Sequence, residues 1–251
     1  MSKNSKVILV PDIHQNIAWL KRIIKKEGRG AHYILMGDYF DARGEEATDD
    51  LEGFCIEFEK VLSEIHYEAL IGNHDALYFE RERNCEKVDG EEFFGGSQYV
   101  FEICGVSSVF ERTRIIKKNL PQFLKSLKPY TNVGEYLVSH AGFNKRYFDN
   151  FNKIDKILDR LYYNTVSPAT AEENHIVLAI GRERGGRDIA GGILWQDLWE
   201  FRDDTPQQQI FAHNRKQGSP VKIGRSWMID MAQTYYGVYD KETKVLTFKK
   251  I

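Results

Sequence analysis

The sequence lacks the features that mark membrane, secreted and disulfide-rich proteins. Its apolar runs are far shorter than the roughly 18 residues that a membrane-spanning helix needs. The apolar run before Pro11 has only four residues, too few for a signal peptide. Three cysteines without a CxxC pair favour reduced thiols over a disulfide framework or a zinc site. We therefore expect a cytoplasmic protein with no membrane segment.

An excess of charge of one sign is also lacking. The chain has 35 Lys and Arg residues against 37 Asp and Glu residues, so it shows no footprint of general nucleic-acid binding. The glycine-rich segment 181–192 has neither GxGxxG nor GxxxxGKS/T, which argues against a nucleotide cradle. We find no internal repeat, low-complexity tract or linker. The 251 residues suit a single domain, 1–251, with insertions at about 76–135 and 144–195.

Strands and helices alternate in the first third of the chain. Short apolar runs at 7–10, 33–36 and 67–71 predict buried strands, and apolar stripes over 17–28 and 49–65 predict helices between them. This alternation is typical of right-handed crossovers and a parallel sheet. Further along the chain we expect helices at 113–127 and 147–163 and strands at 136–139, 209–212, 226–230, 235–239 and 245–249.

Carboxylate, amide and imidazole side chains follow these predicted strands. Asp12 and His14 follow the first strand, and Asp38 follows the second. The strand-end residues further along the chain are Asn73, His74, Asp75, His140 and His213. In open α/β sheets the carboxyl ends of the strands converge on one crevice, and this mixture of donors suits Mn, Fe or Zn. Asp38 is the natural bridge of a centre with two ions about 3.5–4 Å apart.

Each of these residues also has an ordinary structural explanation. Asp-x-His and Asn-His are common in turns, His140 could cap a loop, and His213 could pair with a carboxylate. The structural explanation has to hold at five places, each at a strand end, so we favour the metal centre. His32, His66 and His175 have no such placement, and we expect them to be structural or solvated.

Five short motifs resemble those of the calcineurin-like metallophosphoesterase superfamily, and they occur in the same order. They are PDIHQN, GDYFD, GNHD, SHAG and AHN, and their matching blocks span residues 12–213. The tail IDMAQTYYGVYDKETKVLTF is similar to the closing strands of the phosphoprotein phosphatase branch. The resemblance implies an α/β fold, a four-layer α/β/β/α sandwich with helical insertions, and a dinuclear metal centre.

The resemblance also implies a role for each matching residue. Asp12 and His14 would hold the first metal, and Asp38 would bridge both. The residues that would hold the second metal are Asn73, His140 and His213. A metal-bridging water that ionises near neutral pH would attack phosphorus. The family counterpart of His74 faces the leaving group, and the counterpart of Asp41 orients it. A protonated His74 can donate to the departing oxygen, and Asp41 would raise its pKa.

Three positions depart from the motifs of protein phosphatases. The usual GDxxDRG is interrupted by Ala42, so the arginine expected to hold phosphate is Arg43, displaced by one position. Asp75 stands where many protein phosphatases have glutamate, which loosens the expectation of a protein substrate. Arg215 stands where phosphodiesterase branches carry the second histidine of GHxH, which favours a phosphatase.

The later insertion carries further candidates. Among Arg182, Arg184 and Arg187, one could grip substrate phosphate, although a solvated charged loop also explains all three. Trp195 and Trp199 are four residues apart, and we expect them in the core rather than in a substrate platform.

We expect a metal-dependent phosphoesterase, a hydrolase that cleaves a phosphomonoester as phosphoprotein phosphatases do. Its cofactors would be two divalent metal ions, Mn first and Fe or Zn as alternatives. Its partner would be a phosphorylated substrate, either a phosphoprotein, a nucleotide or a small phosphoester. A second reading is a hydrolase of a nucleotide anhydride or a phosphodiester, such as a dinucleoside polyphosphate or an RNA-end phosphate. A third is a metal-free protein-binding scaffold, which the six intact ligand positions disfavour.

Overall fold

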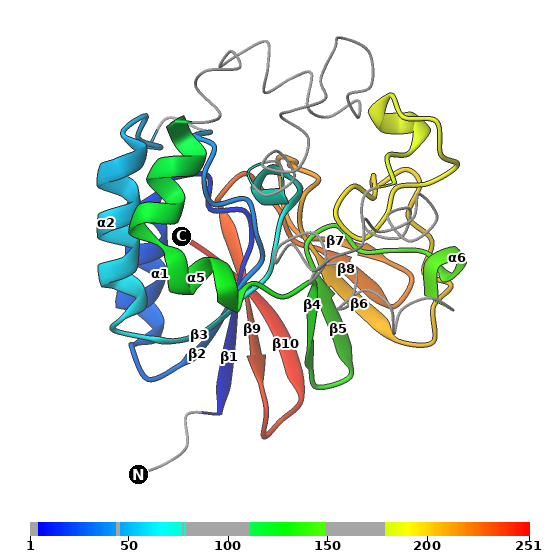
Figure 1. The fold of residues 1–251 in the computed structure, drawn as a ribbon. Helices are drawn as coiled ribbons and strands as arrows, with labels where there is room; N and C mark the ends of the chain where they lie inside the picture. Colours follow the sequence, from blue (N-terminus) through cyan, green and yellow to red (C-terminus); the bar gives the residue numbers. More distant parts are fainter. Residues whose placement is uncertain (1–4, 44–45, 77, 79–110, 149–178) are drawn as a thin grey trace, which may run out of the picture.

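Two β-sheets packed against each other form the centre of the fold in the computed structural model (Figure 1). The structure describes residues 5–43, 46–76, 78, 111–148 and 179–251. The helix predicted at 147–163 lies almost entirely outside these residues.

The first sheet has the strand order β10-β9-β1-β2-β3. Its strands are β1 (Lys6–Val10), β2 (His32–Leu35), β3 (His66–Ala69), β9 (Tyr235–Asp240) and β10 (Val245–Lys250). The first three are parallel, as predicted from the alternation of strands and helices. The C-terminal hairpin adds β9 antiparallel to β1 and β10 antiparallel to β9, so the sheet is mixed rather than parallel throughout.

The second sheet has the strand order β4-β5-β6-β8-β7. Its strands are β4 (Tyr130–Val133), β5 (Tyr136–Ser139), β6 (Gln208–Phe211), β7 (Val221–Ile223) and β8 (Ser226–Met228). The three central strands are parallel, and β4 and β7 are antiparallel edge strands. Neither edge strand was predicted, because each is short and only part of it is buried.

Both faces of β1 are buried, and alternate residues enter two different cores. Val7 and Leu9 belong to the core between the two sheets, whereas Ile8 and Val10 belong to the core beneath the helices. A strand that is covered on both sides reads as a continuous apolar run, which explains the β-branched sequence of β1. The residues that follow β1 are therefore held firmly at the carboxyl end of this central strand.

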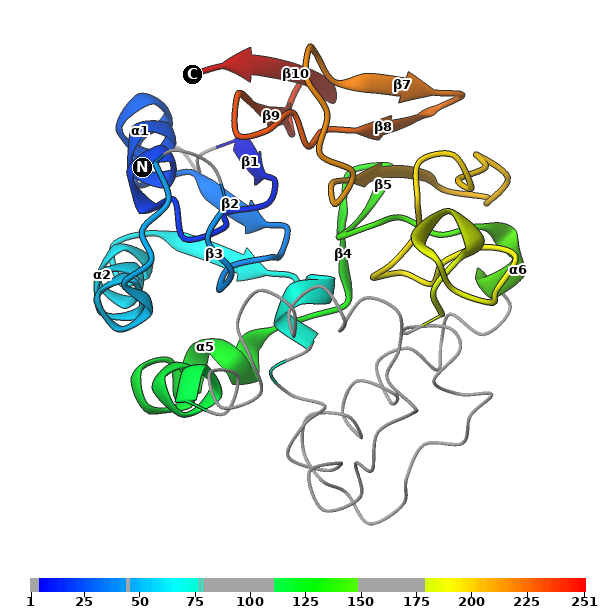
Figure 2. The same ribbon diagram turned by 90° about the horizontal axis from the view of Figure 1, so that it is seen from above.

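Helices α1 (Ile17–Glu27), α2 (Leu51–Leu62) and α5 (Pro121–Ser126) lie on the outer side of the first sheet (Figure 2). The Asn16 side chain caps α1 by accepting a hydrogen bond from the Trp19 N–H at 2.9 Å. The helix predicted over 113–127 is interrupted before Pro121. Proline lacks an N–H and clashes with the preceding turn, so it begins a new helix instead of continuing the first.

The outer side of the second sheet carries a smaller apolar cluster of Phe201, Phe211, Met228 and Met231. Helix α6 (Lys145–Phe148) and a 3₁₀ helix (Arg182–Arg184) lie in the segments on this side (Figure 2). The molecule is thus the α/β sandwich that the sequence predicts. Within the described part of the chain, no helix has the length and apolar character needed to cross a membrane.

Candidate metal centre

Polar side chains from both sheets meet where the strands end. Asp12 lies just beyond β1, Asp38 beyond β2 and Asn73 beyond β3. His140 directly follows β5, and His213 lies just beyond β6. All five are buried, with relative exposures between 0% for His140 and 7% for His213. The structure therefore brings together residues that the sequence places up to about two hundred positions apart.

Asp12, His14 and Asp38 form what we call the first ligand group. The Nε2 atom of His14 lies 3.8 Å from Asp12 Oδ2 and 3.7 Å from Asp38 Oδ2. Its Nδ1 donates a hydrogen bond to the Asp41 carbonyl oxygen at 2.8 Å, so Nε2 presents a lone pair to the two carboxylates. Burial lowers the pKa of His14 to about 3. The imidazole is therefore neutral, which is the form that binds metal ions.

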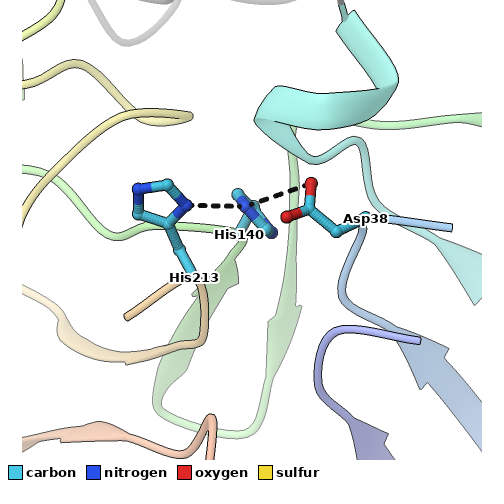
Figure 3. Close-up of side chains that lie close together, drawn as sticks. All are labelled: Asp38, His140 and His213. Carbon is cyan, nitrogen blue, oxygen red and sulfur yellow. Dashed lines mark hydrogen bonds and ion pairs between the residues drawn. The ribbon is translucent and has the colours of Figure 1, made fainter. Parts of the chain in front are cut away.

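Asp38, Asn73, His140 and His213 form what we call the second ligand group. The Asp38 side chain faces His140, and His140 faces His213 (Figure 3). The Nε2 atom of His140 lies 3.6 Å from Asp38 Oδ1 and 2.9 Å from Asn73 Oδ1. It lies 3.2 Å from His213 Nδ1. One carboxylate, Asp38, therefore belongs to both groups.

The hydrogen bonds of His140 show why a cation fits between these atoms. Its Nδ1 donates to the Met36 carbonyl oxygen at 2.8 Å, so Nε2 carries a lone pair. That lone pair faces the amide oxygen of Asn73, which is also an acceptor. The Nδ1 atom of His213 faces the same lone pair at 3.2 Å. A divalent cation would turn these opposed lone pairs into coordinate bonds, and the donors suit Mn, Fe or Zn.

Two glycines allow Asp38 to occupy the centre. A Cβ atom on Gly72 would lie 2.1 Å from Asp38 Oδ1, and one on Gly37 would lie 2.6 Å from Gly72 N. The glycines of the GD and GN motifs are therefore required by the close approach of the two loops. Asp38 and His213 have φ angles of 54° and 66°, a left-handed conformation that is costly for residues with a side chain. Such strain is characteristic of functional sites.

Asp75 holds this arrangement together. Its carboxylate accepts hydrogen bonds from the backbone N–H groups of Asp38 and Tyr39, both at 2.8 Å, and from that of Gly72 at 2.9 Å. The aspartate of GNHD thus joins the loops after β2 and β3. We infer that it supports the site structurally rather than contacting a substrate.

Asp230 is a buried neighbour of the first ligand group that the sequence analysis did not single out. It is 2% exposed, and its Oδ2 has no hydrogen-bond donor among the described residues. Burial raises the pKa of Asp230 to about 6, and its interaction with Asp12 and Asp38 couples the three carboxylates. Burial, Asp230 and Asp38 together raise the pKa of Asp12 well above its usual range. Such a concentration of buried carboxylates also fits a bound cation.

His74 lies beside the ligand groups with its ring held by Asp41. Its Nδ1 is 2.6 Å from Asp41 Oδ2, and its backbone N–H donates to Asp38 Oδ1 at 3.0 Å. Burial on its own lowers the pKa of His74, but Asp38 and the hydrogen bond to Asp41 outweigh it and raise that pKa above the ordinary value. The arrangement therefore favours a proton on His74.

Arg43 reaches the same place despite the inserted Ala42. Its Nη2 lies 2.9 Å from Nε2 of His74. Of the three insertion arginines, Arg184 is the half-buried one, whereas Arg182 and Arg187 are exposed. Arg184 donates from Nε to Asp197 Oδ2 at 2.7 Å and from Nη2 to Asn214 Oδ1 at 2.9 Å. Asn214 is the residue after His213.

The two tryptophans have different environments. Trp195 is 8% exposed, and its ring centroid lies 6.1 Å from that of His213, so it packs in the core beside the second ligand group. The prediction of a core position is wrong for Trp199, which is 70% exposed under the Lys216 ammonium group. Its backbone N–H bonds Asp197, and this loop geometry turns the ring outward.

The other two histidines that the structure describes lie away from the site. His32 lies 3.3 Å from Glu68 at the opposite end of the first sheet, and His66 is exposed. His175 lies outside the described residues. Tyr78 and Arg112 contact Asp41, and no local sequence pattern distinguishes them. Asp230 follows β8, so the strand-end rule would have found it if the predicted strand had ended earlier.

The chain is similar to known proteins both in sequence and in fold. The sequence model of the calcineurin-like phosphoesterase family matches residues 5–220. A cold-active protein tyrosine phosphatase from a Shewanella species superposes with a TM-score of 0.58 at 12% identity, covering 97% of this chain and 80% of that one. A Saccharomyces cerevisiae protein serine/threonine phosphatase with similarity to human PP5 superposes with a TM-score of 0.52 at 16% identity, covering 100% and 80%. At these identities the likeness shows the fold alone. The comparison with curated proteins gives no match.

Proposed function

The chain belongs to the calcineurin-like phosphoesterase family, and we propose that it is a metal-dependent phosphatase that hydrolyses phosphomonoesters. The observation that carries the proposal is the position of Asp38 between two groups of converging acceptor atoms. A histidine and a carboxylate lie beside these groups, where they can act on a leaving group. A protein-binding scaffold would not need buried acceptors that face one another.

The two ligand groups would each hold one divalent ion. We propose Mn as the resident metal, with Fe or Zn as alternatives, because the donors combine carboxylate, amide oxygen and imidazole. Asp12 and His14 would hold one ion, and Asp38 would bridge to the other. The remaining ligands would be Asn73, His140 and His213. When bound, such ions activate water and neutralise charge on phosphoryl oxygens.

We propose that His74 is the general acid. Its Nδ1 is bonded to Asp41, and its Nε2, which lies beside Arg43, is the nitrogen that would face the substrate. The raised pKa of His74 favours its protonated form, and proton donation to a leaving oxygen typically contributes about 10²–10⁴ to the rate. Asp41 keeps the ring in place and stabilises the charged imidazolium, so the proton is delivered in a fixed direction.

Arg43 is proposed to bind phosphate. It reaches within hydrogen-bonding distance of His74 Nε2, so its guanidinium lies next to the position where the proton would be delivered. Protonated His74 and Arg43 are both donors, and only an oxygen acceptor such as a phosphoryl group satisfies the two together. Arg184 is a second candidate because it lies beside the second ligand group, but it already bonds Asp197 and Asn214.

A substrate panel with Mn²⁺ tests the proposal. The panel contains an aryl phosphate, a phosphopeptide, a bis-aryl phosphate, diadenosine tetraphosphate and an RNA with a terminal phosphate. We expect the aryl phosphate and the phosphopeptide to be hydrolysed and the bis-aryl phosphate to be resistant. Preferential cleavage of the bis-aryl phosphate or the tetraphosphate would instead assign the chain to phosphodiester or anhydride hydrolysis.

Asp38→Asn is the matched inactive variant, and His66→Asn is the control, because His66 is exposed and remote from the ligand groups. If no member of the panel were hydrolysed by the metal-loaded protein, the proposed function would be wrong.

We also propose a cytoplasmic location on the basis of cysteine usage. Cys55 is buried and unpaired, while Cys85 and Cys104 lie outside the described residues.

A further inference from the structure

Asp41 has two carboxylate oxygens, and the proposed function uses only one of them. Oδ2 bonds Nδ1 of His74 at 2.6 Å. Oδ1 accepts hydrogen bonds from the Tyr78 hydroxyl group and from Nη2 of Arg112, the latter at 3.3 Å. Building on the proposed function, we propose that Tyr78 and Arg112 are positioning residues, which hold Asp41 in the orientation that aims His74 at the leaving group.

The direction of every hydrogen bond in this chain of side chains is fixed. Arg112 Nε donates to the Tyr78 hydroxyl oxygen at 3.0 Å, and arginine cannot accept. The Asp41 carboxylate cannot donate, so the Tyr78 proton has to point at Oδ1. His74 Nδ1 then donates to Oδ2, and Nε2 faces the site. The orientation of the imidazole thus follows from a series of donors that begins at Arg112.

Arg112 is itself held in place by more than this series. Its Nη2 donates to the Phe40 carbonyl oxygen, and its guanidinium carbon lies 5.8 Å from the Tyr78 ring centroid. Its side chain is 18% exposed, so water competes only weakly for these donors. A guanidinium with several partners in a fixed fork loses little freedom when it forms each bond. Arg112 is therefore a rigid support for both the hydroxyl group and the carboxylate.

Tyr78 is 2% exposed, and its hydroxyl group has a specific purpose in this buried place. A buried hydroxyl group without partners is costly, and phenylalanine would fill the same volume without that cost. The ring already packs edge-on against Phe40 at a centroid distance of 6.0 Å, a contact that phenylalanine would keep. The hydroxyl group therefore contributes through its bonds to Asp41 and Arg112, not through packing.

The test is Tyr78→Phe, compared with Tyr33→Phe. Tyr33 is also buried, and its hydroxyl group donates to the Gly28 carbonyl oxygen at 2.8 Å, next to the end of α1 and away from the site. For Tyr78→Phe we expect unchanged metal content, a KM within about twofold of the wild type, and a kcat that falls about 10-fold for alkyl phosphates. The fall is smaller for p-nitrophenyl phosphate, whose leaving group needs no proton. Tyr33→Phe should leave all of these values unchanged.

Arg112 provides a second variant. Arg112→Lys keeps the charge but not the fork, and Arg112→Met removes both, so we expect Arg112→Met to lose more kcat than Arg112→Lys on the alkyl phosphate. Equal losses for good and poor leaving groups in Tyr78→Phe, or losses explained by metal content, would overturn the positioning role.

An NMR measurement separates this inference from the proposed function. The Nδ1–H proton of His74, assigned with His74→Asn, should shift in Tyr78→Phe and not in Tyr33→Phe. An unchanged resonance in Tyr78→Phe would contradict the inference even if the protein is a phosphatase. A shifted resonance in a protein that hydrolyses nothing in the panel would support the hydrogen-bond chain and leave only the proposed function overturned.

Discussion

The two ligand groups share Asp38 but are built in different ways. The first group comes from the loops after two neighbouring strands, β1 and β2, within residues 12–38. The second group extends from Asp38 to His213 and needs strand ends from both sheets. The first therefore depends on the local structure of one sheet. The second depends on how the two sheets pack.

Their electrostatics differ as well. The first group concentrates negative charge, because Asp12, Asp38 and Asp230 are buried together. The second group has a single carboxylate and otherwise neutral donors, and the Arg184 guanidinium is close enough to lower the pKa of His213 further after burial. Without a cation, repulsion between carboxylates opposes folding in the first group. In the second group, folding is opposed by lone pairs that face one another. Six substitutions, grouped in four experiments, test this comparison.

Asp38→Asn should abolish the distinction between the groups because both lose their shared carboxylate. We expect the loss of both ions and a fall in kcat/KM of at least about 10³-fold, since each preorganised charge typically contributes about 10²–10³. Elemental analysis of the purified variant measures the ions, and the aryl phosphate assay measures the rate. A fully metallated and active variant would show that Asp38 is not the bridge.

His14→Asn and His213→Asn should separate the groups. Each removes an imidazole ligand from one group only, so each variant should retain about one ion per chain instead of two. Activity should fall about 10²–10³-fold in both, because hydrolysis needs the complete centre. Metal-to-protein ratios by elemental analysis check this, and the loss of both ions from either variant would mean that the groups are not independent.

Asp230→Asn should reveal the charge of the first group. The pKa of Asp230 is raised from 3.8 to about 6, so its charged form destabilises the metal-free fold above about pH 6 and not below about pH 4. Metal-free Asp230→Asn should therefore melt at a higher temperature than the wild type at pH 7, and the difference should vanish near pH 4. With Mn²⁺ present the advantage should shrink, because the wild-type carboxylate attracts the ion. Thermal melts at the two pH values measure both effects.

Ile210→Val and Ile8→Val should have the smallest effects. Both side chains are fully buried, and each substitution should cost about 0.5–1.5 kcal/mol of unfolding free energy. Ile210 lies between the sheets on the strand before His213, whereas Ile8 faces the helices. Only Ile210→Val should weaken binding of the second ion, as measured by Mn²⁺ titration calorimetry. Equal weakening by both substitutions would argue against a dependence on sheet packing.

The same contrast explains how much the sequence could predict. The strands and helices between residues 7 and 75 have local apolar patterns, and the structure brings their strand-end residues Asp12, Asp38 and Asn73 to the same end of the sheet. The antiparallel pairing of β9 on β1 was not predicted, because it joins residues more than two hundred positions apart. The exposed position of Trp199 was missed for a similar reason, since a loop hydrogen bond and not helical periodicity sets it.

Some supporting residues have no sequence signal at all. Tyr78 and Arg112 are 34 positions apart and bond each other beside Asp41. Asp75 was visible in GNHD, but its bonds to backbone N–H groups depend on the close approach of two loops. Side chains that touch a motif from outside it are recognised only once the fold has brought them there.

Anomalous diffraction from crystals grown with Mn²⁺ tests the central claim most directly. The account predicts two peaks about 3.5–4 Å apart, with the carboxylate of Asp38 between them. Asp12 and His14 should coordinate one peak, and Asn73, His140 and His213 should coordinate the other. A single peak, or two peaks of which only one contacts Asp38, would contradict it.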